Sequence, residues 1–288
     1  MTEGKSLRKA PLRHLRGFRF FVVSCLGLAG FLQSAQAHDL FLKFNSYYLA
    51  PNTNVEVRLL NGEFHHSANS IERDRMRDVS VVAPSGVTHP PLENWRDAGT
   101  ETVLRFATKE AGTYVIGTSI KPRELKMKAA EFNRYLQSEG VADTLLERQK
   151  NGQLKEDSNE RYSKHVKAIF QVGDARSDTF QKALGYPVEI IPLQNPYTLK
   201  PGATLTVRCV KDGQPLANQS VLYGWQTRSG PATTRQTRTD AQGLAQIKLQ
   251  AVGVWYIKFI NMTRVNEGAV NYESKWATLT FLLGAKGQ

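Results

Sequence analysis

Short segments in which apolar and polar residues alternate, bounded by Gly and Pro turns, recur along the chain after residue 38. Val55, Val57 and Leu59, for example, alternate with Glu56 and Arg58. A period of two is the signature of a strand with one buried face, and many such strands separated by turns are typical of a β-sandwich. We expect strands near 40–45, 55–60, 78–83, 102–107, 112–118, 188–191, 203–210, 221–225, 233–239, 244–249, 253–261 and 276–282.

The pattern changes at Pro122, where apolar residues fall at helical spacing up to Gly140, a C-cap glycine. Asp143 predicts the cap of a short helix over 144–149, and Tyr162, His165 and Phe170 lie on the apolar face of a further helix that ends at Gly173. The expected fold is therefore mainly β, with two β-sandwich domains of Ig-like or prealbumin-like type, 38–121 and 173–288. A helical insertion over 122–172 is expected to pack on the first domain.

The first 37 residues have the pattern of a cleavable signal peptide. Six Lys and Arg residues precede an apolar run from Phe20 to Leu32, and Ala35-Gln36-Ala37 supplies an A-x-A cleavage site. The apolar run is shorter than the roughly 20 residues that a transmembrane helix needs, although a retained anchor is the alternative. Cleavage after Ala37 makes His38 the first residue of an exported, periplasmic or cell-surface protein that is not embedded in the membrane.

Composition argues against several classes of function. Removing residues 1–37 lowers the formal net charge from +12 to +7, and the remaining basic residues are not gathered into blocks. Aromatic and basic residues are not interleaved as binding of single-stranded nucleic acid requires, so no nucleic-acid partner is expected. Cys209 is the only mature cysteine, and its alternating strand context predicts a small buried apolar residue. No hydrolase, zinc-protease or phosphate-loop motif is present, and we expect no enzyme.

A set of motifs spans nearly all of the mature chain: Ala37–Asp39, Phe132–Gly140, Arg161–Lys167 with Gly173, Leu184–Pro192, Asn195–Tyr197, Gly213–Ala217, Arg238–Gly243 and Trp255. Together these motifs resemble the DUF4198 family, exported bacterial proteins grouped with periplasmic components of nickel or cobalt uptake. The resemblance implies a β-sandwich fold and, as a role, handling of a divalent transition metal. Where relatives often have Gly-His after the second strand, this chain reads Gly62-Glu-Phe-His-His66.

The candidate metal ligands are His38, His65 and His66, with Glu63 beside them. An N-terminal histidine offers its α-amine and its imidazole, and one further imidazole completes a three-nitrogen set suited to Cu(II) or Ni(II). Adjacent strand residues point to opposite faces, so only one of His65 and His66 faces such a site if the strand continues. His165 is interpreted as a packing histidine and His89 as a turn residue.

The sequence thus favours a periplasmic protein that binds nickel, cobalt or copper, as the ion or as a complex. Such a protein would hand its cargo to a membrane or outer-membrane transporter. A non-catalytic structural or interaction module of the cell envelope is the alternative. A copper-dependent oxidase built on a histidine brace shares the His38 chemistry, but the rest of the sequence does not resemble those enzymes.

Overall fold

The alternating segments form strands in the computed structural model, which describes Met1, residues 38–227, Gly230 and residues 233–284. The predicted signal peptide lies outside the described residues except for Met1. Every strand expected from the alternating pattern is present, and short additional ones join them. The mainly β architecture with sandwich-like sheets is therefore confirmed.

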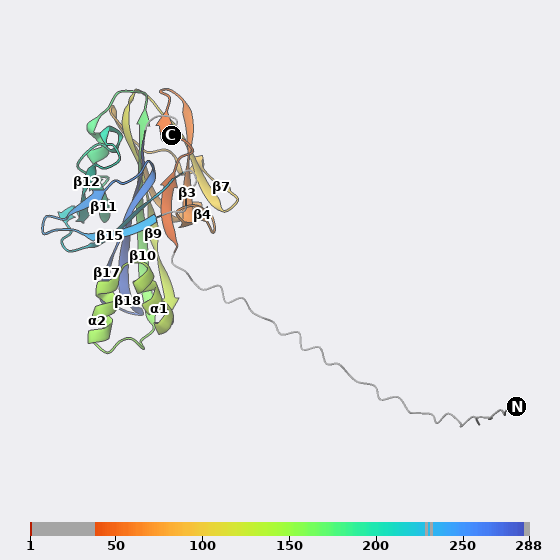
Figure 1. The fold of residues 1–288 in the computed structure, drawn as a ribbon, viewed down its shortest axis with the longest axis vertical. Coiled ribbons are helices and arrows are strands. Elements are labelled where there is room, and N and C mark those ends of the chain that lie inside the picture. Colours follow the sequence, from red (N-terminus) through yellow and green to blue (C-terminus); the bar gives the residue numbers. More distant parts are fainter. Residues whose placement is uncertain (2–37, 228–229, 231–232, 285–288) are drawn as a thin grey trace. The chain divides into compact units, whose positions relative to one another are not determined.

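The described strands lie in three sheets (Figure 1). The five-stranded sheet contains β1 (Asp39–Lys43), β3 (Asn54–Glu63), β4 (His66–Ser67), β7 (Trp95–Ala98) and β8 (Glu101–Ala107). The nine-stranded sheet contains β2 (Tyr48–Leu49), β5 (Met76–Ala83), β6 (Gly86–Thr88), β9 (Gly112–Met127), β10 (Ser158–Val172), β14 (Ser220–Gln226), β15 (Thr233–Arg238), β17 (Gly253–Glu267) and β18 (Val270–Leu283). The four-stranded sheet contains β11 (Val188–Pro192), β12 (Thr204–Lys211), β13 (Gln214–Pro215) and β16 (Leu244–Lys248).

The nine-stranded sheet contains strands from both ends of the folded part of the chain, from β2 to β18. β10 pairs antiparallel with β9 on one side and parallel with β18 on the other. One apolar core also runs through all three sheets, from Leu40 in β1 to Val207 in β12 and Leu279 in β18. The nine-stranded sheet and the apolar core thus include residues on both sides of the predicted boundaries at 121 and 172. The domain boundaries themselves stay predictions.

Two helices follow one another, α1 (Ala129–Ser138) and α2 (Ala142–Lys150). Figure 1 shows them at one end of the long strands β10, β17 and β18. Phe132 and Leu136 of α1 bury their side chains against Tyr272 and Trp276 of β18. Gly140 has φ 72°, the left-handed conformation expected of a residue that ends a helix. None of the helices described here has the length and apolarity to cross a membrane.

Three details of the predicted helical insertion are wrong. Residues 122–127 continue strand β9, and residues 158–172 form strand β10, where a helix was expected over 162–170. β10 is buried on both faces, so its sequence has no polar face from which a strand period can be recognised. The side chains of Lys164 and Lys167 on this strand are also buried. The short helix also begins at Ala142, which leaves Asp143 in its first turn and not at its cap.

The tight turn between β12 and β13 follows from local chemistry. Asp212 and Gly213, between β12 and β13, have φ 49° and 76°, as the Asp-Gly pair of a tight hairpin requires. Cys209 is fully buried and is not in a disulfide, as expected of a small apolar residue.

The shared core predicts the effect of truncating its members. Leu279→Ala should lower the free energy of unfolding by about 2–5 kcal/mol, because Leu279 has no exposed surface and its removal leaves a cavity. Leu146→Ala on α2 is the control, since that side chain is 52 % exposed and alanine favours helix. Urea unfolding followed by tryptophan fluorescence measures both; an equal loss in the two variants would contradict the burial of Leu279.

Candidate functional site

The start of β1 lies beside the end of β3. Asp39 pairs with Gly62 across the β1–β3 ladder, so His38 lies one step further along, next to Glu63. A two-residue turn then reverses the chain, and Glu63 pairs with His66. The ladder brings the backbone of all four predicted ligands to one end of the five-stranded sheet: His38, Glu63, His65 and His66.

The hairpin that carries the two histidines is anchored by Phe64. The Phe64 ring lies edge-on to Phe41, with ring centroids 5.0 Å apart, and 4.7 Å from the ring of Tyr256. The ammonium group of Lys43 donates a hydrogen bond of 2.8 Å to the Phe64 carbonyl. Gly62 permits the tight return, because a Cβ at that position would lie 2.4 Å from the carbonyl oxygen of a neighbour in β4. The turn is therefore held in place from both sides.

The histidine side chains themselves point largely into solvent. His65 Nε2 lies 3.3 Å from Glu63 Oε2, and these two side chains are 52 % and 75 % exposed. His66 is also exposed. Among the residues that the structure describes, no three His, Cys, Asp or Glu side chains are grouped so that they could hold a metal ion. The predicted ligands thus share one end of the sheet without forming a site from side chains alone.

A buried ion-pair triad lies directly behind His38. Lys258 on β17 forms ion pairs with Asp39 of β1 and with Glu139, the residue that follows α1, the latter at 2.8 Å. The Lys258 side chain is 10 % exposed, and its two partners are 13 % and 19 % exposed. Burial acts to lower the pKa of Lys258, but the two carboxylates outweigh it and raise that pKa above its ordinary value. The triad ties the first strand to the helices and to β17.

Lys164 holds the backbone of residue 38 itself. Its ammonium group donates to the His38 carbonyl, and it lies 4.7 Å from the ring centroid of Trp276 and 5.2 Å from that of Tyr162. Burial lowers the pKa of Lys164 to about 8, although the nearby Asp39 carboxylate acts in the opposite direction. The His38 peptide is thereby fixed by a long side chain from the central strand β10.

The same surroundings favour the neutral form of the His38 imidazole. Partial burial and then the charge of Lys164 lower its pKa, while Asp39 acts to raise it. A neutral imidazole has a lone pair for a metal, whereas a protonated one has none. At neutral pH, His38 therefore presents the form that metal binding requires.

A third buried carboxylate, Glu160 of β10, completes the charged region. Its Oε1 accepts hydrogen bonds from Tyr135, at 3.1 Å, and from Ser274, while its Oε2 has no partner among the described residues. Burial raises the pKa of Glu160 above its ordinary value. Asp39 Oδ1 is also buried without a described partner. Two carboxylate oxygens in this part of the interior are thus without a hydrogen-bond partner among the described residues.

These buried charges are not evident from the sequence. The one local signal was a charged residue inside an apolar run, as at Lys258 between Trp255 and Ile260. The pairing itself joins residues 219 positions apart, Asp39 and Lys258, which no local pattern encodes.

His165 is the packing histidine that the sequence predicted. Its Nδ1 lies 2.9 Å from Ser119 Oγ and its Nε2 lies 3.1 Å from Ser163 Oγ, so both ring nitrogens are satisfied. Burial, followed by the charge of Arg77, lowers its pKa to about 4. His89 lies near Asp78, Nδ1 to Oδ1 3.4 Å, in an exposed position just after β6.

The buried triad predicts a large difference between two lysine substitutions. Lys258→Met should destabilise the protein by about 3–5 kcal/mol, because it leaves two buried carboxylates without their cation. Lys128→Met breaks an exposed pair with Asp157 and should change stability little. Chemical unfolding of both variants at pH 7 is the measurement, and similar losses would show that the triad is solvated.

His165 predicts a pH dependence of stability. Its folded pKa of about 4 lies below the roughly 6.5 of an unfolded histidine, so only the unfolded state takes up a proton between these values. The free energy of unfolding should therefore fall by up to about 3 kcal/mol as pH drops from 6.5 to 4. His165→Gln should remove this contribution and His89→Gln should not. Parallel pH dependences of wild type and His165→Gln would contradict the assignment.

Similarity to solved structures is remote. The chain is 11 % identical to the D0-D1 domain of intimin, with 84 % of this chain and 97 % of that one covered and a TM-score of 0.20. It is 10 % identical to a tetra-tandem repeat in the extending region of a large adhesion protein, covering 85 % and 49 %, with a TM-score of 0.22. For a two-domain fibronectin type III segment of chicken tenascin the identity is 13 %, the coverage 86 % and 98 %, and the TM-score 0.20.

A family model gives a clearer result. No curated protein matches the chain significantly. The model described as a domain of unknown function, DUF4198, matches residues 35–263, which is most of the chain and includes β1, the β3–β4 hairpin and the buried triad. The chain belongs to the DUF4198 family.

Proposed function

We propose that the mature protein is an exported, non-catalytic protein that binds a divalent transition metal through an N-terminal His38. Residues 1–37 have the composition of a cleavable signal peptide, and cleavage after Ala37 frees the α-amine of His38. That amine and the imidazole are two nitrogen ligands on one residue. A third nitrogen would come from His65 or His66.

The observation that carries this proposal is the ladder that joins Asp39 to Gly62 and Glu63 to His66. It means that a free N-terminus would emerge next to the hairpin that bears the two other histidines. Their exposed side chains can rotate toward it, since neither is packed in the core. Side chains alone do not form a three-ligand group among the described residues, and the α-amine is the ligand that processing would add.

Preorganisation also supports the proposal. Chain termini are usually poorly ordered, but here β1 pairing, the contact of Lys164 with the His38 carbonyl and the Asp39–Lys258 ion pair all act on the first two mature residues. A ligand that is already held in place loses less conformational freedom on binding. Imidazole and amine nitrogens suit Ni(II), Co(II) and Cu(II), and Cu(II) should bind most tightly.

The chemistry leads to a role in uptake. A carrier in the periplasm would capture the ion, or a small complex of it, and release it to a membrane or outer-membrane transporter. Because the α-amine exists only after processing, the precursor would not bind the metal before export.

A second candidate, a structural or interaction module of the cell envelope, is favoured by one observation. The described residues contain no ready-made three-side-chain metal group, and such a module needs none. Metal content of the mature protein separates the two candidates.

Calorimetric titration of two chains tests the proposal. One begins at His38 and the other at Ala37, so that the side chains from residue 38 onward are the same. In the longer chain the His38 α-amine is a peptide nitrogen, and Ala37 carries the free amine instead. We expect submicromolar binding of Cu(II), weaker binding of Ni(II) and Co(II), and a loss of at least about 100-fold in the longer chain. Affinity should fall as pH drops to 5, because protons compete for the nitrogens.

Two single variants identify the third ligand. Of the variants His65→Gln and His66→Gln, the one that removes the ligand should weaken Cu(II) binding about tenfold or more. The other variant should bind Cu(II) as the wild type does. Equal affinity of the chains beginning at His38 and Ala37 would contradict an N-terminal site. No binding to either chain would favour the interaction module.

A further inference from the structure

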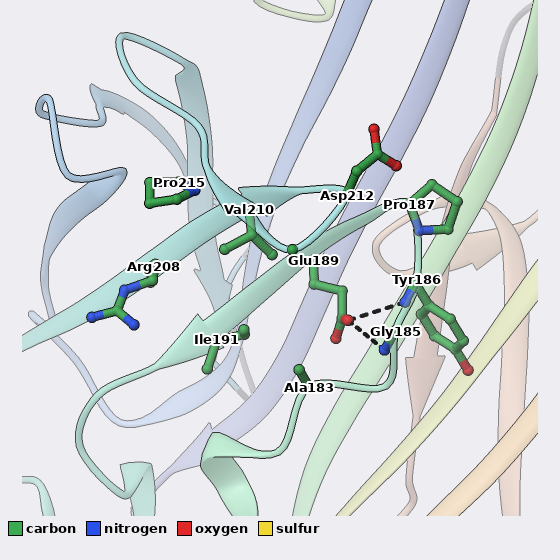
Figure 2. Close-up of a pocket in the computed structure, with 11 residues that line it drawn as sticks. Ala183, Gly185, Tyr186, Pro187, Glu189, Ile191, Arg208, Val210, Asp212 and Pro215 are labelled. Atoms are coloured by element: carbon green, nitrogen blue, oxygen red, sulfur yellow. Dashed lines mark hydrogen bonds between the residues drawn. The ribbon is translucent and has the colours of Figure 1, made fainter.

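A hollow of about 520 Å³ lies over β11 and β12 (Figure 2). Its volume falls within the range of sites for small molecules. Ile191 and Val210 form an apolar floor, the loop from Ala183 to Pro187 forms one wall, and Pro215 of the next hairpin lies on the other side. The hollow is separate from the four predicted metal ligands, none of which lines it.

The loop wall is held rigidly by one buried carboxylate. Glu189 accepts backbone hydrogen bonds from Leu184 at 2.9 Å, Gly185 at 2.8 Å and Tyr186 at 3.0 Å. Figure 2 shows two of these contacts. Its other partner is Lys167 of β10 at 2.8 Å, and both side chains of this pair are at most 4 % exposed. A carboxylate satisfied in this way is structural, and it fixes the wall before any ligand arrives.

The charges lie at the two ends of the floor. Arg208 pairs directly across from Ile191 in the β11–β12 ladder, and its exposed guanidinium group makes no hydrogen bond or ion pair with a described residue. Asp212 is also exposed without a described side-chain partner, and its backbone N–H donates to the Pro187 carbonyl at 2.8 Å. Figure 2 shows Val210 between these two charged residues.

We propose that this hollow binds a short apolar peptide, with its C-terminal carboxylate on Arg208 and its N-terminal ammonium near Asp212. Residues 209–211 at the end of β12 lie between Arg208 and Asp212, so the Cα atoms of these two residues are about 13 Å apart. An extended peptide of four residues spans the same distance.

The chemistry of each part fits this ligand. A guanidinium group recognises a carboxylate by two parallel hydrogen bonds, and it has no competing partner here. The apolar floor suits aliphatic side chains, and the opposite charge at the far end fixes the direction of the chain. A simple organic anion would use Arg208 but would make no use of Asp212, so end-blocked peptides distinguish the two ligands.

The test is an NMR titration of the 15N-labelled mature protein with the tetrapeptide Ala-Leu-Ala-Leu, in the presence of EDTA to exclude metal binding. We expect saturable shifts of the Gly185, Val210 and Gly213 amides with a Kd at or below about 1 mM. Arg208→Gln should weaken binding about tenfold, and amidation of the peptide C-terminus should do the same. N-acetylation should weaken binding several-fold.

Lys248→Gln is the matched control. Lys248 is an exposed cation of the same four-stranded sheet, paired across from Thr204 and outside the hollow. This variant should bind the tetrapeptide as the wild type does. Absence of saturable shifts, equal affinity in Arg208→Gln, or equal binding of either end-blocked peptide would overturn the proposal. Because the titration excludes metal, its outcome is independent of the N-terminal metal site.

Discussion

Polar and charged side chains on the buried central strand β10 connect the separate parts of this protein. β10 lies between β9 and β18 and has almost no exposed surface, yet it carries Glu160, Lys164 and Lys167. A buried charge destabilises a fold unless it is paired, so each of these residues requires a partner from elsewhere. Glu160 contacts α1 and β18, Lys164 holds the start of β1, and Lys167 pairs with Glu189 of β11.

This arrangement gives each candidate site a fixed base. The His38 peptide is held by Lys164, and Asp39 is held by Lys258, so the segment at which the proposed mature chain would begin is fixed in place. The wall of the hollow over β11 is fixed by Glu189, whose charge is balanced by Lys167. Buried pairs of this kind contribute more to position than to net stability, because desolvation offsets much of their attraction.

Much of the fold could be predicted from the sequence, because apolar and polar residues alternate in strands with one buried face, and these strands end at Gly or Pro turns. The Asp212-Gly213 turn and the buried Cys209 follow from local chemistry in the same way. β10 was mistaken for a helix since it is buried on both faces. The candidate site could not be predicted in the same way. His38 lies near Glu63 and His66 because of strand pairing, and Lys258 forms its ion pairs with residues from distant segments. Neither arrangement follows from local sequence.

The position of a bound metal would show whether His38 is its ligand. Crystals of the mature protein grown with Cu(II), with anomalous scattering measured at the copper edge, would locate the ion without assumptions about its ligands. The account predicts one strong peak at roughly 2.0–2.1 Å from both the α-nitrogen and an imidazole nitrogen of His38, a distance typical of metal–imidazole bonds. A peak elsewhere, with the His38 nitrogens unbound, would contradict it.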